Sequence, residues 1–449
     1  MMGCRRVEQA ALFYEFSLER HVPTDHVLRS IDRFVELGEL RRGLAAFYST
    51  MGRPSIDPEL MIRMLIIGYC LGIRSERRLC EEVHLNLAYR WFCRLGLDGH
   101  VPDHSTFSKN RHGRFRESDL LRRVFETVLQ RCIREGLVGG EAFAVDASLI
   151  KADANRQKGI EGEKGLPPEA ASRAVEEYMA VLDDEAFGAA TDVVPKFVSP
   201  ADPAARWTGA HGGQAFFAYS TNYLIDVDNA IIVDVEATTA IRQAEVLAAK
   251  RMIERSIDRF DLYPARLLGD SAYGSAEMLG WLVYQHGIEP HVTVFDKSTR
   301  QDGTFSRHDF IYDHVGDVYS CPAGKMLTTT GSRVDGATLR YRASKYDCQT
   351  CRLKPRCCPT EPARYVPRSI YEGARDMARQ IASSRQGRTA RRLRKKVEML
   401  FAHLKRILRL DRLRLRGPMG ARDEFLLAAT AQNLRKLAKL ISMPSPHPA

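Results

Sequence analysis

The sequence lacks several features that would assign it to other classes of protein. No apolar run is long enough to cross a membrane, since the best candidate, Leu60 to Ile73, is short and contains Arg63. Acidic residues come early and no small-residue cleavage site follows an apolar core, so we expect no secretory signal. Internal repeats are also missing, which excludes a repeat architecture. We therefore expect a cytoplasmic protein without a membrane partner.

Acidic residues are scarce in one segment near the C-terminus. Between Arg385 and Arg416 there are 13 Lys and Arg residues but only two acids, Glu398 and Asp411, which gives this segment a charge of +11. The remaining 54 basic and 54 acidic residues balance, so this segment carries the whole net charge of the chain. Such a concentration favours a polyanionic partner, usually nucleic acid, over the alternative of a solvated helix face.

Half of the ten cysteines are clustered. Cys348-x₂-Cys351-x₅-Cys357, with Cys321 upstream in a Cys-Pro-x-Gly turn, provides four thiolates for a structural zinc ion. Cys358 is a rival ligand, and free reduced thiols in a loop domain are the alternative. The others are scattered, and three of them follow helical patterns like small buried hydrophobes (Cys4, Cys70, Cys80, Cys93, Cys132).

The first 140 or so residues are predicted to be helical. Asp57-Pro58 is a typical start for a helix. Further helices are expected over 75–83 and 86–94, and after Asp103 or Ser105. Helices joined by such short turns form either a helix-turn-helix DNA reader or a small bundle without a ligand, and the spacing leaves both open.

The pattern changes to mixed α/β from Glu141 onward. After a long loop or insertion over 156–205, with one helix at 168–182, a hairpin is followed by alternating helices and strands, which is typical of a mixed α/β core. The strands are expected at 142–145, 216–225, 230–235, 266–268 and 290–294, and the helices at 244–257 and 275–285.

These patterns divide the chain into three parts. We expect a helical N-terminal domain over 1–135 that binds DNA, and a catalytic core made of 140–295 plus 381–442. Residues 296–380 form a β-rich insertion domain that carries the cysteine cluster. Helical periodicity returns from Thr389 to about Leu410, and a last apolar helix covers 425–441.

Three carboxylates are the candidate catalytic residues. Asp146 and Asp270 end predicted strands, where a sheet opens onto a ligand, although either one alone is more typical of a turn or cap. Glu398 lies on a helix, and Arg394 and Lys405 share its face. The alternative for this face is a surface ladder of ion pairs.

Carboxylates on separate core elements suit phosphodiester chemistry. Mg²⁺ binds one or two carboxylates together with water and phosphate oxygens. Two such ions about 4 Å apart stabilise the attacking and leaving oxygens of an in-line displacement. Lys and Arg side chains nearby would hold the phosphates.

Three segments resemble bacterial insertion-sequence transposases of the DDE family. AVDASLIKADAN is similar to the segment with the first family acid, at Asp146, and LLGDSAYGS is similar to that with the second, at Asp270. The family signature around the last acid is Tyr, two residues, Arg, three residues, Glu, six residues, Lys. Arg394, Glu398 and Lys405 match it, but Arg391 takes the place of the Tyr. Residues 50–115 also resemble the helical N-terminal domain of these transposases.

This resemblance implies the fold, the chemistry and the partners. The fold would be a ribonuclease-H-like mixed-sheet core with a helical N-terminal domain and a β-rich insertion between the second and third acids. The enzyme would bind terminal inverted repeats as a dimer or larger assembly. It would cut double-stranded DNA with two Mg²⁺ or Mn²⁺ ions held by Asp146, Asp270 and Glu398. It would then transfer the 3′-hydroxyl ends to target DNA. The candidate DNA contacts are Arg391, Arg394, Lys395, Lys405 and Arg406.

Two other functions fit the same residues. A nuclease of the same fold that cuts without joining would need the same acids. A transposase-derived DNA-binding protein without activity would have lost at least one acid. All three are present, and Arg391 is the departure that favours this alternative.

Overall fold

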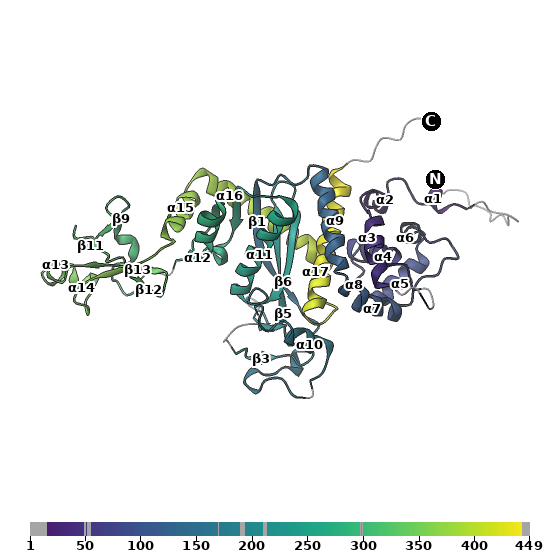
Figure 1. The fold of residues 1–449 in the computed structure, drawn as a ribbon, viewed down its shortest axis with the longest axis horizontal. Coiled ribbons are helices and arrows are strands. Elements are labelled where there is room, and N and C mark those ends of the chain that lie inside the picture. Colours follow the sequence, from purple (N-terminus) through teal and green to yellow (C-terminus); the bar gives the residue numbers. More distant parts are fainter. Residues whose placement is uncertain are drawn as a thin grey trace, which may run out of the picture.

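The computed structural model describes residues 16–48, 51, 55–168, 170–188, 194–209, 213–296, 298 and 300–441. Figure 1 shows an elongated molecule, with helices of the N-terminal region at one end and a small β-rich lobe at the other. A mixed α/β core lies between them. This arrangement confirms the predicted α/β fold class, with a helical N-terminal region and a β-rich lobe inserted before the last helices.

A six-stranded mixed sheet forms the core. The strand order is β4-β5-β1-β7-β8, and β6 pairs with β5 beside β4. β1 runs antiparallel to β5 and parallel to β7, and β7 runs parallel to β8. Three antiparallel strands, β6, β5 and β1, are followed across the sheet by two strands, β7 and β8, that run parallel to β1. This is the ribonuclease-H-like order. The strands are β1 (Ala142–Lys151), β4 (Arg206–Thr208), β5 (Phe216–Asp226), β6 (Ile231–Thr239), β7 (Arg266–Gly269) and β8 (Glu289–Val292).

Long helices cover the two faces of this sheet. Alternate residues of β5 point to opposite faces. On one face Ser220 donates a hydrogen bond to Glu245 of α11 (Arg242–Phe260). On the other, Tyr223 packs against Phe401 of α16 (Arg385–Arg406). The last helix, α17 (Pro418–Leu440), packs along β6, where the Asn433 amide pairs with the backbone of Ile232.

The N-terminal region is helical, as predicted. The predicted caps Asp57 and Asp103 each accept a hydrogen bond from the first turn of a helix, and Ser75 and Asn86, at the starts of the two other predicted helices, do the same. The helices are α1 (Leu18–His21), α2 (Val27–Asp32), α3 (Gly38–Leu44), α4 (Pro58–Cys70), α5 (Glu76–Leu85), α6 (Leu87–Phe92), α7 (His104–His112), α8 (Arg114–Glu117) and α9 (Leu120–Arg134).

Buried ion pairs join these helices to the core. Arg74, which follows α4, pairs with Glu424 of α17, and both side chains are almost fully buried. Arg122 of α9 pairs with Asp234 of β6, and Arg255 of α11 contacts the second oxygen of the same aspartate at 2.7 Å. Charges buried this deeply are costly to separate. The N-terminal helices and the core are therefore held together by charge as well as by apolar packing.

The described residues between 156 and 205 form the expected insertion, and most of them lie outside helices and strands. Its helix, α10 (Arg173–Met179), is shorter than the predicted 168–182. Two short strands, β2 (Ile160–Glu161) and β3 (Phe197–Val198), pair with each other. The Glu177 side chain ties α10 to both Arg116 of α8 and the start of α17.

The β-rich lobe contains a second six-stranded sheet, with strands β9 (Ile311–Asp313), β10 (Val318–Ser320), β11 (Met326–Thr328), β12 (Arg333–Val334), β13 (Thr338–Ala343) and β14 (Tyr365–Ser369). Two short helices, α13 (Lys345–Gln349) and α14 (Lys354–Cys357), carry cysteines. Figure 1 shows this lobe extending away from the core sheet.

Several helices depart from the predictions. A helix over 372–383 was not expected, yet α15 (Glu372–Ser383) forms there and packs against β8 and α12 (Ala276–Gly280). α16 begins at Arg385, four residues before the expected start at Thr389. The predicted helix over 275–285 is α12 followed by a π-helical turn, Trp281–Gln285.

Among the described residues, no helix is long and apolar enough to span a bilayer.

Candidate active site

The first two candidate acids lie side by side on neighbouring parallel strands. Ala144 of β1 is in register with Leu268 of β7, and Asp146 and Asp270 each come two residues later. Asp270 follows the end of β7, as predicted. Asp146 does not end its strand, because β1 continues to Lys151 through its pairing with β5. The parallel pairing with β7 ends at Ala144, so β1 and β7 are no longer paired at Asp146.

The turn after Asp270 is tightly built. The Asp270 carboxylate accepts a hydrogen bond from the Ala272 amide at 2.7 Å and caps a 3-10 turn, Ser271–Tyr273. A Cβ at Gly274 would lie 2.1 Å from the Thr293 carbonyl oxygen, so only glycine lets this turn lie against the end of β8. The position of the Asp270 side chain is therefore fixed by its own turn and by the neighbouring strand.

The Asp146 carboxyl is in an unfavourable place for a negative charge. Burial raises its pKa to about 6, and the nearby charges of Asp270 and Glu245 add to this effect. Arg394 of α16 opposes it. In the register of the sheet Asp146 lies opposite Tyr223, which places its side chain on the face that α16 covers. A metal cation or a DNA-bound cation would relieve this concentration of negative charge.

Glu245 is a site residue that the sequence analysis missed. It lies in the first turn of α11, where Ser220 holds it with a hydrogen bond of 2.7 Å. Burial raises its pKa, and Asp270 raises it further, so these two carboxylates lie near each other. The signal in the sequence was only an acid early in a helix, which is ordinary for a helix N-terminus. The fold, and not a motif, brings this residue to the strand ends.

Glu398 lies on α16 and is exposed to solvent. Among the described residues it has no hydrogen bond or ion pair, so its carboxylate is available for another partner. Arg394, one turn before it, is the residue of this helix that acts on Asp146. The structure therefore places Asp146 and Asp270 at adjacent strand ends, with Glu245 near them on the α11 side and the helix that carries Glu398 on the other side. Among the described residues, no three of these acids are grouped closely enough to hold a metal ion.

The five predicted DNA contacts fall on different surfaces of α16. Arg394 faces the acids, whereas Lys395 lines a pocket elsewhere on the molecule. Lys405 is partly buried near Asp411, and burial lowers its pKa. Arg406 is exposed, and Arg391 donates a hydrogen bond of 3.1 Å to the Ala382 carbonyl at the end of α15. The residue at the family's Tyr position thus joins two helices.

The clustered cysteines line one small cavity of about 20 Å³ in the β-rich lobe (Cys321, Cys348, Cys351, Cys357, Cys358). All five are free thiols. The Lys325 amide donates a hydrogen bond of 3.3 Å to Cys321 Sγ, as in a turn that stabilises a thiolate. Among the residues with a described position, no three His, Cys, Asp or Glu side chains are grouped closely enough to hold a metal. The zinc site therefore stays a prediction.

Two family models of transposase domains match parts of the chain. A transposase domain model, DUF772, matches residues 16–113, which covers most of the N-terminal helices. A transposase DDE domain model matches residues 320–438, from the β-rich lobe through α16 and most of α17. Both matches support a DDE transposase, and that family implies dependence on a divalent metal.

Similarity to proteins of known structure or function is slight. A structure of the piggyBac transposase, in a synaptic complex with hairpin DNA, aligns with a TM-score of 0.33 and 10% identity. The alignment covers 93% of this chain and 73% of that one. No curated protein matches the sequence.

The donor set of this transposase fits a hard divalent cation. Asp146 and Asp270 offer carboxylate oxygens from adjacent strand ends, and the charge of Glu245 acts on both. Mg²⁺ and Mn²⁺ prefer oxygen ligands and commonly bind only one or two protein carboxylates, with water and phosphate completing the shell. The raised pKa of Asp146 fits as well, since a bound cation would favour its charged form.

Proposed function

We propose that this transposase binds the terminal inverted repeats of an insertion sequence, cuts them, and joins the 3′-hydroxyl ends to target DNA. The observation that carries the proposal is the pairing of Asp146 with Asp270 at the point where β1 and β7 diverge, with Arg394 of α16 acting on Asp146. A nuclease that does not join would use the same residues, and joined products distinguish the two.

In this proposal Asp146, Asp270 and Glu398 hold two Mg²⁺ or Mn²⁺ ions. The ions would activate the attacking oxygen and stabilise the leaving one. Glu398 is the acid that approaches from α16, and its exposure leaves it free to turn toward the metal when DNA binds. Glu245 adds negative charge behind the two aspartates and helps to hold a cation between them.

The cations of α16 would position the DNA. Arg394 lies next to the acids and would hold the phosphate beside the scissile one. Lys405 shares the Arg394 face, three helical turns away, and would hold the duplex further along. Arg391 and Arg406 would add contacts at either end of the helix. We also propose that the active assembly is a dimer or larger, since two element ends must be joined to one target.

We further propose that the cysteine cavity holds one structural zinc ion. The lobe has a small apolar core, and three of its ten buried residues are cysteines. A small domain with such a core commonly needs a metal or disulfides to be stable. The ion would be bound by Cys321, Cys348, Cys351 and Cys357, and it would take no part in the cutting of DNA.

The test of the proposed function is a set of matched variants in a cutting and joining assay. Asp270→Asn should bind element ends as the parent does, but it should not cut them. Glu398→Gln should behave in the same way. Equal cutting by parent and variants would contradict the site.

A further inference from the structure

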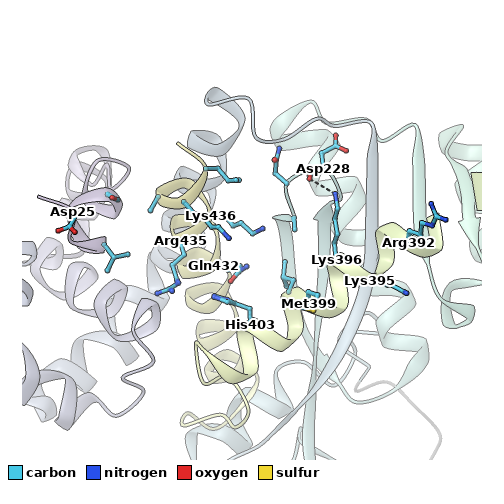
Figure 2. Close-up of a pocket in the computed structure, with 18 residues that line it drawn as sticks. Asp25, Asp228, Arg392, Lys395, Lys396, Met399, His403, Gln432, Arg435 and Lys436 are labelled. Carbon is cyan, nitrogen blue, oxygen red and sulfur yellow. Dashed lines mark hydrogen bonds between the residues drawn. The ribbon is translucent and has the colours of Figure 1, made fainter. Parts of the chain in front are cut away.

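A basic groove of about 940 Å³ lies between the N-terminal helices and the C-terminal helices α16 and α17. Figure 2 shows it, with Arg392, Lys395 and Lys396 on α16 and Arg435 and Lys436 on α17. The β5–β6 turn at Asp228 closes one side, and Asp25 before α2 lies across the opening. We refer to the site lined by these residues and by Met399, His403, Gln432 and Lys439 as the basic groove.

Positive charge predominates in the basic groove. Six Lys and Arg side chains line it, against the two acids Asp25 and Asp228. Within the described part of the chain, none of the six forms an ion pair with an acid. Lys396 and Arg435 donate to backbone carbonyls, at 3.1 Å and 2.9 Å. Burial lowers the pKa of Lys436, and Lys439 and Lys396 lower it further by repulsion. Gathering unpaired cations costs free energy, which an anionic ligand would offset.

The floor of the basic groove carries unsatisfied polar atoms. Gln432 is only 3% exposed, yet its Oε1 has no hydrogen-bond partner. His403 Nδ1 is also buried without a partner. Buried polar atoms in folded proteins are normally satisfied by protein or water. Both side chains line the groove. Burial lowers the pKa of His403 and the Gln432 side chain raises it, so the two lie close enough to satisfy each other.

The basic groove is distinct from the candidate active site. An α-helix turns by about 100° per residue, so Arg392, Lys396, Met399 and His403 form one face of α16. Arg394, with Glu398 and Lys405, lies roughly 140–160° around the helix from that face. The buried stripe of α16, which includes Leu400 and Leu404, separates the two on one side. A ligand in the groove would therefore contact the face of α16 that points away from the acids.

We propose that the basic groove binds the phosphate backbone of a second stretch of double-stranded DNA, apart from the stretch that is cut. The inference rests on the proposed function, because the ligand is identified as DNA from the protein's own substrate. Two rows of cations, one along α16 and one along α17, fit the repeated phosphates of a strand better than they fit one small anion. The contacts go to phosphates, so binding in the groove would be independent of sequence.

The test is a triple variant, Lys395→Gln/Lys436→Gln/Lys439→Gln, whose side chains make no hydrogen bond or ion pair among the described residues. The control is Lys158→Gln/Lys164→Gln/Lys196→Gln, which changes the net charge equally at exposed positions outside the groove. The probe is a fluorescent DNA duplex of random sequence, titrated at several salt concentrations. The parent, both triple variants and Asp146→Asn are also tested for cutting of element ends.

The groove variant should lose about tenfold or more in affinity, and the slope of log affinity against log salt should fall by about 0.9 for each lost phosphate contact. The control should keep the parent slope. An unchanged slope in the groove variant would overturn the inference. Polyglutamate serves as a second probe. If the groove variant bound the duplex as the parent does but lost the parent's binding of polyglutamate, the inference would also be overturned, since the groove would then serve an acidic protein segment. A parent that binds duplex but never cuts would count against the proposed function and not against the groove.

Discussion

Asp146 and Asp270 occupy equivalent positions on adjacent parallel strands, each two residues past the last paired residues, Ala144 and Leu268. Two other buried acids, Asp234 and Glu424, are matched by arginines. Here burial and like charge act together, and one cation, Arg394, opposes them. Such an imbalance is typical of a functional site rather than a structural one.

The pH dependence of stability should reveal the strain at Asp146. In metal-free protein the folded state keeps a proton on Asp146 up to about pH 6, whereas an unperturbed aspartate titrates near 3.8. Between these values the folded state holds more protons than the unfolded state, so its stability falls as pH rises. Asp146→Asn removes this loss. Above pH 7 the variant should be more stable than the parent by about 1–2 kcal/mol, after allowance for solvent screening.

Chemical denaturation in the presence of a chelator, from pH 4 to pH 8, measures this difference. The exposed Asp258→Asn, on α11, is the control and should show no pH-dependent gain. Added Mg²⁺ should stabilise the parent and not the Asp146→Asn variant. A parent and variant with parallel stability profiles would show that Asp146 is not strained.

Glu245→Gln should reduce cutting without abolishing it. Its carboxylate adds charge beside Asp146 and Asp270, so loss of that charge should weaken metal binding. Groups that support metal ligands typically contribute about 10–100-fold to affinity or activity. The expected signature is a higher Mg²⁺ requirement, measured as cutting rate against metal concentration. The control is Glu254→Gln, on the exposed side of the same helix, which should match the parent. An equal change in Mg²⁺ requirement from both variants would mean that the loss of any acid from α11 has this effect, whatever its distance from Asp146 and Asp270.

Asp234→Ala should weaken the attachment of the N-terminal helices to the core. It leaves Arg122 and Arg255 buried without their shared carboxylate. Breaking a buried pair by removing one partner costs about 3–5 kcal/mol. The free energy of unfolding, from denaturant titration, checks this value. A loss below 1 kcal/mol, roughly that of a surface pair, would mean that the two arginines find water or other acceptors.

The cysteine cavity should contain one zinc ion per chain, as measured by elemental analysis of protein purified without chelator. Cys348→Ser/Cys351→Ser should lose the metal and lower the melting temperature of the lobe. Cys80→Ser, at a scattered and partly exposed cysteine, should keep it. The contrary result would be parent protein that contains no metal, is as stable as metal-loaded protein, and has all its clustered thiols free to react in the native state. That result would favour reduced thiols.

Local patterns were enough to predict most elements, because caps and periodicity act within a few residues. Asp57, Ser75, Asn86 and Asp103 begin helices as expected. The strand through Asp146 was predicted too short, since its second half is held by pairing with β5, which is remote in sequence. α15 was missed because its pattern is interrupted by charged residues that find their partners only in the folded protein, such as Arg379 with Asp296.

The candidate site was predictable only where a motif marked it. Asp146 and Asp270 stand in short strands followed by recognisable segments, and the sheet brings them together. Glu245 has no such segment, and its place depends on how α11 crosses the sheet. The single basic segment around α16 also divides in three dimensions. Arg394 faces the acids and Lys395 faces the basic groove, a separation that a count of charge cannot show.

The most direct test of the central claim is a plasmid assay with the element's native locus and both flanks, purified protein, Mg²⁺ or Mn²⁺, and a second target plasmid. Parent and Asp146→Ala would be compared side by side. Metal-dependent cuts at the element ends with joined products from the parent, and none from the variant, are the predicted result. DNA binding by the parent without any cutting, in either metal, would contradict the account and indicate a DNA-binding derivative, with Arg391→Tyr the first reversion to test.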